Sequence, residues 1–101
     1  MAGVAGLMRE RLRRLHADGR EHTWRAEIRY VSGRREVRVR AWGAGKNGQA
    51  LQVDVHPATP ADEWMYPEPA NVRTLIRTAL ARGWHPETRG GTFTLPPHTL
   101  T

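Results

Sequence analysis

The sequence predicts a single α+β domain over residues 1–101, a two-layer sandwich in which two helices lie on one face of a mainly antiparallel sheet. Three observations favour this fold. Three central segments alternate apolar and polar residues, one segment on each side of them has apolar residues at helical spacing, and a short final segment alternates again. The expected order of elements is therefore α-β-β-β-α-β.

Residues 1–20 are expected to form a basic amphipathic helix. Met8, Leu12 and Leu15 recur at i, i+4 and i+7, and Gly19 is a residue type that commonly follows a helix end. Arginines occupy most of the remaining surface of this segment. Whether such a helix packs on the rest of the domain stays open at this stage.

Three strands are predicted over residues 23–31, 35–42 and 50–56. Ser32 and Gly33 provide turn chemistry between the first two, so these are expected to form a hairpin. The residues predicted to face the core are Trp24, Ala26, Ile28, Tyr30, Val37, Val39, Ala41, Leu51, Val53 and Val55.

The segment AWGAGKNGQAL, residues 41–51, contains the only lysine of the chain among three glycines. A phosphate-binding P-loop has the spacing G-x-x-x-x-G-K-[ST] and is followed by a helix, whereas Lys46 precedes an asparagine and the loop leads into a strand. We therefore predict a hairpin turn at Asn47-Gly48, with Lys46 at its tip. A weak anion site on the loop backbone is the alternative.

The connector over residues 56–71 contains four of the seven prolines, and Trp64, Met65 and Tyr66 follow one another within it. We favour packing of these side chains over the core, and the alternative is an exposed patch covered by a partner.

The rest of the chain is expected to be a helix, a short strand and a loose tail. Val72, Leu75, Ile76 and Ala79 share one helical face, and the helix is predicted over residues 69–82. The strand covers residues 92–95, and residues 96–101 form the flexible tail.

Charge is the strongest compositional signal, because 16 basic residues against 10 acidic ones give a formal net charge of +6. Residues 1–46 hold 12 of the basic and 5 of the acidic side chains. This asymmetry favours a partner with phosphates or acidic groups, although an arginine-rich composition is also typical of GC-rich bacterial genomes. There is no long apolar run and no secretory signal pattern, so we expect a soluble, cytoplasmic protein without membrane contact.

No arrangement of residues predicts catalysis. The chain has no cysteine, its five histidines include no helical i, i+4 pair, and its only serine lies in a turn. We therefore expect no enzymatic activity, no metal and no cofactor.

Two stretches carry a family resemblance that covers roughly residues 23–95: RVRAWGAGKNGQALQVDV, and YPEPANVRTLIRTALARGWHPETRGGTFTL. They resemble a group of uncharacterised small bacterial proteins with a WG-G-K loop, a VR-x-x-I-x-x-AL-x-x-GW-x-P helix and a G-x-F-x-L strand. The resemblance implies no activity. It implies that Trp84, after the helix end at Gly83, is anchored in the core.

The open face of the predicted sheet and the aromatic connector are the candidate binding surfaces. The protein is interpreted as a small bacterial interaction module, an accessory or immunity-type protein with a protein partner of unpredicted identity and an unpredicted oligomeric state. The alternative is a nucleic-acid-binding protein that uses the basic N-terminal half and stacks a base on its exposed tryptophan. Pairing of the arginines with neighbouring acids would favour the first hypothesis. The candidate binding residues are Arg25, Arg29, Arg38, Arg40, Trp42, Lys46, Trp64 and Tyr66.

Overall fold

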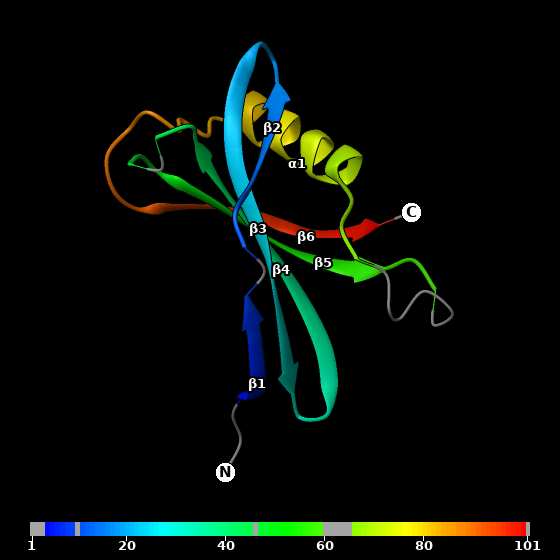
Figure 1. The fold of residues 1–101 in the computed structure, drawn as a ribbon. Helices are drawn as coiled ribbons and strands as arrows, with labels where there is room; N and C mark the ends of the chain where they lie inside the picture. The colour runs from blue at the N-terminus through cyan, green and yellow to red at the C-terminus, as the bar shows by residue number, and fades with distance from the viewer. Residues whose placement is uncertain (1–3, 10, 46, 60–65, 101) are drawn as a thin grey trace.

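Alternating apolar and polar residues form a six-stranded sheet, and one helix within the described residues covers one face of it in a computed structural model (Figure 1). The structure describes the backbone of residues 4–9 and the whole of residues 11–45, 47–59 and 66–100. The elements are β1 (Val4–Arg9), β2 (Arg13–Ala17), β3 (Arg20–Val31), β4 (Arg34–Gly43), β5 (Ala50–Pro57), α1 (Pro69–Ala81) and β6 (Thr92–Leu100).

Strand β3 is the longest described strand, with 12 residues, and it pairs with both strands at one edge of the sheet. Its first half pairs with β2 and its second half with β1, so β1 and β2 follow one another along the same side of β3 (Figure 1). Strand β4 pairs along the other side. The order is β1-β3-β4-β5-β6, and every pair is antiparallel except β5 with β6.

The predicted two-helix sandwich is wrong, because the segment expected to be the first helix forms β1 and β2 instead. Leu15 and Ala17 are buried at a spacing of two, whereas Leu12 is 40% exposed. Asp18 and Gly19 both have positive φ, 51° and 75°, and connect β2 to β3 as a two-residue hairpin turn. Gly19 therefore belongs to a β-turn. The helical spacing of Met8, Leu12 and Leu15 arises by chance, because these residues belong to two successive short strands and the segment between them.

The second predicted helix is confirmed at its start and ends one residue earlier than expected, at Ala81. The Glu68 N–H donates to Asn71 Oδ1 at 2.8 Å before the first turn. At the other end, Gly83 has a φ of 106° and the Trp84 N–H donates back to the Ala79 carbonyl at 2.9 Å. This geometry stops the helix and directs Trp84 toward the sheet.

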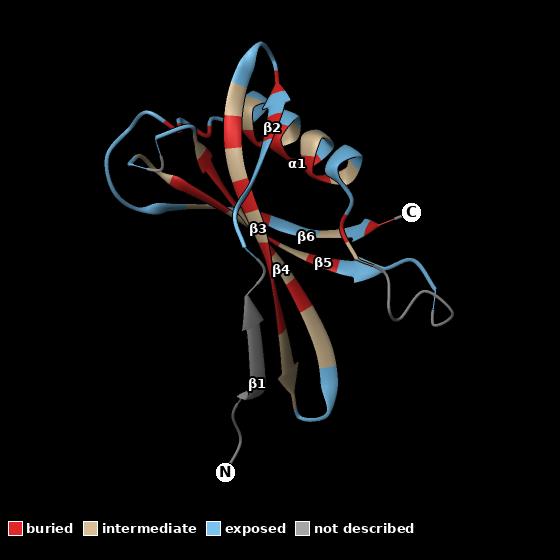
Figure 2. Cartoon of the chain, in the orientation of Figure 1, coloured by how far each residue is buried: buried red, intermediate tan, exposed pale blue. Residues whose placement is uncertain are grey.

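The core lies between α1 and the sheet, as the buried stripes on both elements show in Figure 2. The inward residues predicted on β3, β4 and β5 are buried, except that Tyr30 is only partly buried. Trp84 is 1% exposed, so its predicted role as a core anchor is confirmed. Helix α1 contributes Val72, Leu75, Ile76 and Ala79.

The predicted loose tail is also wrong. Strand β6 continues to Leu100, which is 6% exposed, and it pairs in parallel with β5 after the chain crosses over through α1. The segment escaped prediction because Pro96 and Pro97 interrupt its alternation. Prolines are compatible with an edge strand, where one row of N–H groups has no strand partner.

Two arginines of α1 attach the helix to the β2–β3 hairpin. Arg73 Nε donates to the His16 carbonyl at 2.9 Å, and Arg77 Nε lies 3.2 Å from Asp18 Oδ1. No helix in the described ranges is long and apolar enough to cross a bilayer.

Candidate functional site

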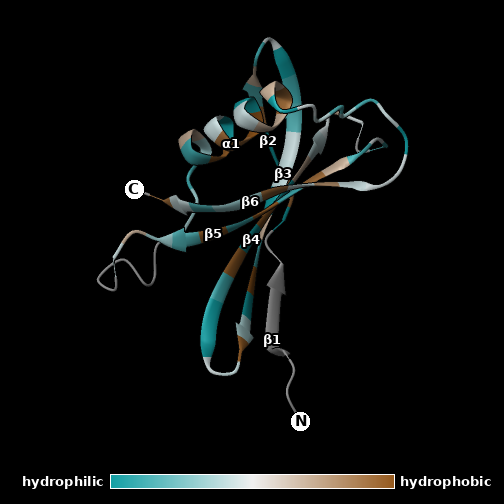
Figure 3. Ribbon diagram, turned by 180° about the vertical axis from the view of Figure 1, so that it is seen from behind, coloured by the Kyte–Doolittle hydropathy of each residue, from teal (hydrophilic) through white to brown (hydrophobic). Residues whose placement is uncertain are grey.

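The outward side chains of β3, β4 and β5 form a surface on the side of the sheet away from the core, which we call the arginine face. It also contains part of the β3–β4 hairpin, whose end near the turn is strongly hydrophilic in Figure 3. The four predicted arginines on it are between 18% and 30% exposed. The arginine face consists of Arg25, Glu27, Arg29, Glu36, Arg38, Arg40, Trp42 and Asp54.

The strand register pairs two of these arginines with acids directly across the ladder. Arg29 lies opposite Glu36, with Nη2 3.2 Å from Oε1, and Arg38 lies opposite Asp54, with Nε 2.8 Å from Oδ1. Directly opposed residues of opposite charge stabilise a sheet by some tenths of a kcal/mol, up to about 1 kcal/mol. These two pairs therefore follow from the alternation of the sequence.

Glu27 joins the other two arginines. Arg25 Nη2 lies 3.3 Å from Glu27 Oε2 on the same strand, and Arg40 Nε lies 3.4 Å from Glu27 Oε1 diagonally across β4. Glu27 is only 4% exposed, so its charge has to be compensated locally. All four arginines thus have an acidic neighbour on their own face.

The Arg38–Asp54 pair is the most complete, because a second nitrogen, Nη2, lies 3.5 Å from Asp54 Oδ2. The hydrogen bond to Asp54 raises the pKa of Arg38 against the opposing effect of burial. A pKa that is raised by folding stabilises the folded state at every pH below the ordinary pKa. This stabilisation is lost only as the pH rises through the raised pKa. This contribution is therefore present throughout the neutral range and is lost only in strong alkali.

Trp42 lies on the arginine face as predicted, but it is only 8% exposed. The guanidinium carbon of Arg25 lies 5.6 Å from the centre of its ring. A base-stacking platform needs an uncovered ring. The expectation of an exposed tryptophan on this face is therefore wrong.

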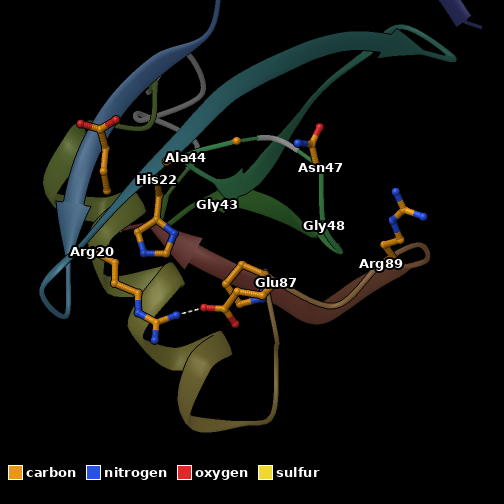
Figure 4. Close-up of a pocket in the computed structure, with 11 residues that line it drawn as sticks. Arg20, His22, Gly43, Ala44, Asn47, Gly48, Glu87 and Arg89 are labelled. Atoms are coloured by element: carbon orange, nitrogen blue, oxygen red, sulfur yellow. Dashed lines mark ion pairs between the residues drawn. The ribbon is translucent and has the colours of Figure 1, made fainter.

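A second candidate site is a pocket of about 500 Å³ at the end of the sheet where β3 begins and β4 ends. We call it the glycine-loop pocket. Ligand sites for small molecules usually have volumes of about 300–1,000 Å³. Three segments far apart in the sequence form it (Figure 4). Its lining is Arg20, Glu21, His22, Gly43, Ala44, Gly45, Asn47, Gly48, Pro86, Glu87 and Arg89.

One wall of the pocket depends on close contact between two loops. A Cβ added to Gly48 would lie 1.6 Å from the Pro86 carbonyl oxygen, so only glycine fits there. Gln49 N–H donates to the Thr88 carbonyl at 2.6 Å, and Trp84 Nε1 donates to the Gln49 carbonyl at 3.0 Å. The loop after β4 is therefore fastened to the loop after α1.

These contacts also correct the predicted turn at Asn47-Gly48. Gly48 does not have the positive φ of a two-residue hairpin turn, and β4 and β5 are separated by residues 44–49. The glycine is required by the approach of another loop and not by a turn.

His22 is the most unusual side chain of the pocket. It is 1% exposed, and neither ring nitrogen has a hydrogen-bond partner among the residues that the structure describes. Its ring centre lies 5.8 Å from that of Trp84. In Figure 4 the imidazole points from β3 toward the side of the pocket where Arg20 and Glu87 lie. A buried polar side chain without a partner costs about 1–3 kcal/mol, so this group requires an explanation.

The charged side chains of the pocket differ in their partners. Arg20 forms an ion pair with Glu87, and Glu21 Oε1 lies 3.9 Å from Arg14 Nε on β2. Arg89, at the other end of the pocket in Figure 4, forms no ion pair with any residue that the structure describes. Both acids of the lining therefore have a basic partner other than Arg89.

The structure brings the four predicted arginines together with Trp42. Tyr66 packs against the core, partly buried, in agreement with the favoured interpretation of the aromatic connector. Lys46, Trp64 and Met65 lie outside the described residues.

The pocket residues other than the glycine loop were not predicted from the sequence. His22 precedes Trp24 by two positions, so the alternation of β3 places it on the core side of the sheet. A histidine at a core-facing position is the signal that could have indicated a site.

Comparison of the chain with protein-family models, curated proteins and solved structures finds no match. The resemblance to uncharacterised small bacterial proteins therefore stays a prediction. Within the described ranges, no three histidine, aspartate or glutamate side chains are grouped as metal ligands.

Proposed function

We propose that the protein is a non-catalytic bacterial interaction module, of an accessory or immunity type, that binds a protein partner in the cytoplasm through the arginine face. The observation that carries this proposal is the pairing of all four arginines with acids on the same surface. This pairing holds the guanidinium groups in fixed positions, so fewer side-chain rotamers are lost when a partner binds.

The paired arginines keep hydrogen-bonding capacity for a partner. A guanidinium has five N–H donors, whereas the hydrogen bonds to the acids use one donor of Arg29 and two of Arg38. A partner with carboxylate side chains and exposed backbone carbonyls supplies acceptors for the remaining donors. Arginine is also enriched among the residues that contribute most to protein interfaces.

A nucleic-acid partner is less well supported. Nucleic-acid binding requires positive charge that is free to neutralise phosphates, and single-stranded binding also uses exposed aromatic rings that stack on bases. The four arginines share their face with three acids, and Arg25 covers Trp42. The basic excess of the chain alone therefore does not favour a polyanion at this surface.

The proposal is tested by capturing partners with the immobilised protein and then repeating the binding with the purified partner. The informative variant is Arg29→Gln with Arg38→Gln, because the acids left behind, Glu36 and Asp54, are 43% and 40% exposed and stay solvated. The control variant is Arg11→Gln with Arg82→Gln, which removes the same charge at two exposed positions outside β3, β4 and β5.

A partner that binds the wild type and the control, and loses at least about tenfold in affinity for the informative variant, would support the proposal. In parallel, the protein is titrated with labelled single- and double-stranded DNA and RNA at low and moderate salt. Nucleic-acid binding that persists at moderate salt and is weakened only by the informative variant would replace the proposal with the alternative.

A further inference from the structure

The glycine-loop pocket has three properties that together indicate a small-molecule ligand and not a protein partner. It has the volume of a small-molecule site, a buried histidine at one end and an uncompensated arginine at the other. Nothing in the interaction proposed for the arginine face uses these groups.

His22 defines the first requirement of the ligand. A neutral imidazole carries one N–H donor and one acceptor nitrogen, and both are without a partner. The neighbouring ring of Trp84 offers neither, because its Nε1 already donates to the Gln49 carbonyl. A hydroxyl group can donate and accept at once, so a ligand hydroxyl is suited to this end of the pocket.

Arg89 defines the second requirement. The acids of the lining are occupied, Glu87 by Arg20 and Glu21 by Arg14, so they do not compete for Arg89. In Figure 4 Arg89 lies at the end of the pocket away from His22. Its guanidinium favours a carboxylate, which accepts two parallel hydrogen bonds from it.

The wall between these ends defines the body of the ligand. Gly43 and Gly48 pack against Pro86, which lies where their side chains would be and adds an apolar ring to the wall. Such a wall offers few polar side chains along the length of a ligand.

We propose that the glycine-loop pocket binds a small, elongated hydroxy-carboxylic acid with an apolar body, its hydroxyl against His22 and its carboxylate against Arg89. His22 is thereby a ligand-binding residue whose missing hydrogen-bond partner is supplied by the ligand. This site is separate from the arginine face and does not depend on it.

The test is a titration of the ¹⁵N-labelled protein with trans-4-hydroxycinnamate, followed by NMR at the backbone amides and the His22 ring nitrogens. Two analogues each lack one group: trans-cinnamate has no hydroxyl, and 4-ethylphenol has no carboxylate. We expect saturable shifts at Gly43, Ala44 and Gly48, a change at the His22 ring, and about tenfold weaker binding of each analogue.

Two variants test which ligand group binds at each end of the pocket. His22→Phe is expected to bind trans-4-hydroxycinnamate and trans-cinnamate equally, and Arg89→Gln is expected to lose about tenfold for both carboxylates but not for 4-ethylphenol. Arg34→Gln removes an exposed arginine elsewhere and is expected to bind as the wild type does. Arg89 is exposed, so this arm remains informative even if His22→Phe does not fold.

Three results would overturn the proposal. The first is no saturable shift with trans-4-hydroxycinnamate. The second is equal affinity for all three compounds, which would indicate apolar adsorption. The third is shifts centred on the arginine face, or binding that Arg34→Gln weakens as much as Arg89→Gln, because either would indicate a general charge effect.

Discussion

The arginine face and the glycine-loop pocket differ in how their polar groups are satisfied. On the arginine face, four arginines have acidic partners at 2.8–3.4 Å on the same surface. In the pocket, a buried histidine has no hydrogen-bond partner among the described residues and Arg89 has no described acid beside it. Paired arginines form a preorganised surface that suits a protein partner, whereas unsatisfied polar groups in a pocket indicate where a small ligand would bind.

The two regions also differ in how they are built. The arginine face lies on regular strands, where an alternating sequence fixes which residues stand opposite one another. The pocket forms where the start of β3 meets two loops, and its wall depends on the packing of Gly48 against the backbone at Pro86. Substitutions should therefore affect the two regions by different mechanisms.

The largest effect is expected for Gly48→Ala. The new Cβ would overlap backbone atoms of Pro86 at 1.6 and 2.7 Å, so one of the two loops must move. We expect a loss of at least about 3 kcal/mol in the free energy of unfolding, at the upper end of the usual cost of overpacking, measured by denaturant unfolding.

Gly43→Ala is the matched control, because its Cβ would meet Pro86 at an ordinary 3.5 Å. It should cost less than about 1 kcal/mol. Equal losses for both variants would show that the pocket wall does not depend on the close approach at Gly48.

The second largest effect is expected on the arginine face, for Glu27→Gln. This substitution removes the negative charge that Arg25 and Arg40 share, at a position that is 4% exposed. We expect a loss of about 2 kcal/mol, below the cost of breaking a fully buried pair because the arginines are partly solvated.

Glu36→Gln on the same face removes a carboxylate that is 43% exposed and should cost less than about 0.5 kcal/mol. If thermal and denaturant unfolding give the two variants the same stability, the burial of Glu27 is not what holds this face together.

A smaller effect of opposite sign is expected for His22→Phe in the free protein. Removing two unpartnered ring nitrogens while keeping an aromatic ring beside Trp84 should leave the stability unchanged or raise it by up to about 1 kcal/mol. A loss of more than about 2 kcal/mol in denaturant unfolding would identify His22 as a structural residue.

The smallest effect is expected for Arg20→Gln. Its ion pair with Glu87 joins side chains that are 62% and 66% exposed, so its loss should change the stability by less than about 0.5 kcal/mol. A markedly larger change in unfolding midpoint would mean that this pair closes the pocket as a structural element.

Those parts of the fold with one strong periodicity were predicted correctly from the sequence. Strands β3, β4 and β5 alternate over their whole buried length, and α1 combines a helical stripe with Pro69 at its start and Gly83 after its end. In these segments local propensity and burial agree, so the pattern specifies the element.

Other parts depend on information that a local pattern does not contain. Met8, Leu12 and Leu15 have helical spacing. The strand conformation is fixed instead by the turn at Asp18-Gly19 and by the pairing of β2 with β3. Strand β6 contains two prolines and is defined by its parallel pairing with β5. The pocket depends on contacts between distant loops, so its residues could not be gathered from the sequence.

The most direct test of the comparison between the two regions is the unfolding of wild type and His22→Phe with and without saturating trans-4-hydroxycinnamate. We predict that the free variant is at least as stable as the wild type, and that the ligand raises the stability of the wild type by more than that of the variant. Equal stabilisation of both proteins, or none, together with a variant that is less stable when free, would contradict the account. His22 would then be a structural residue, and the pocket would not be a site for this class of ligand.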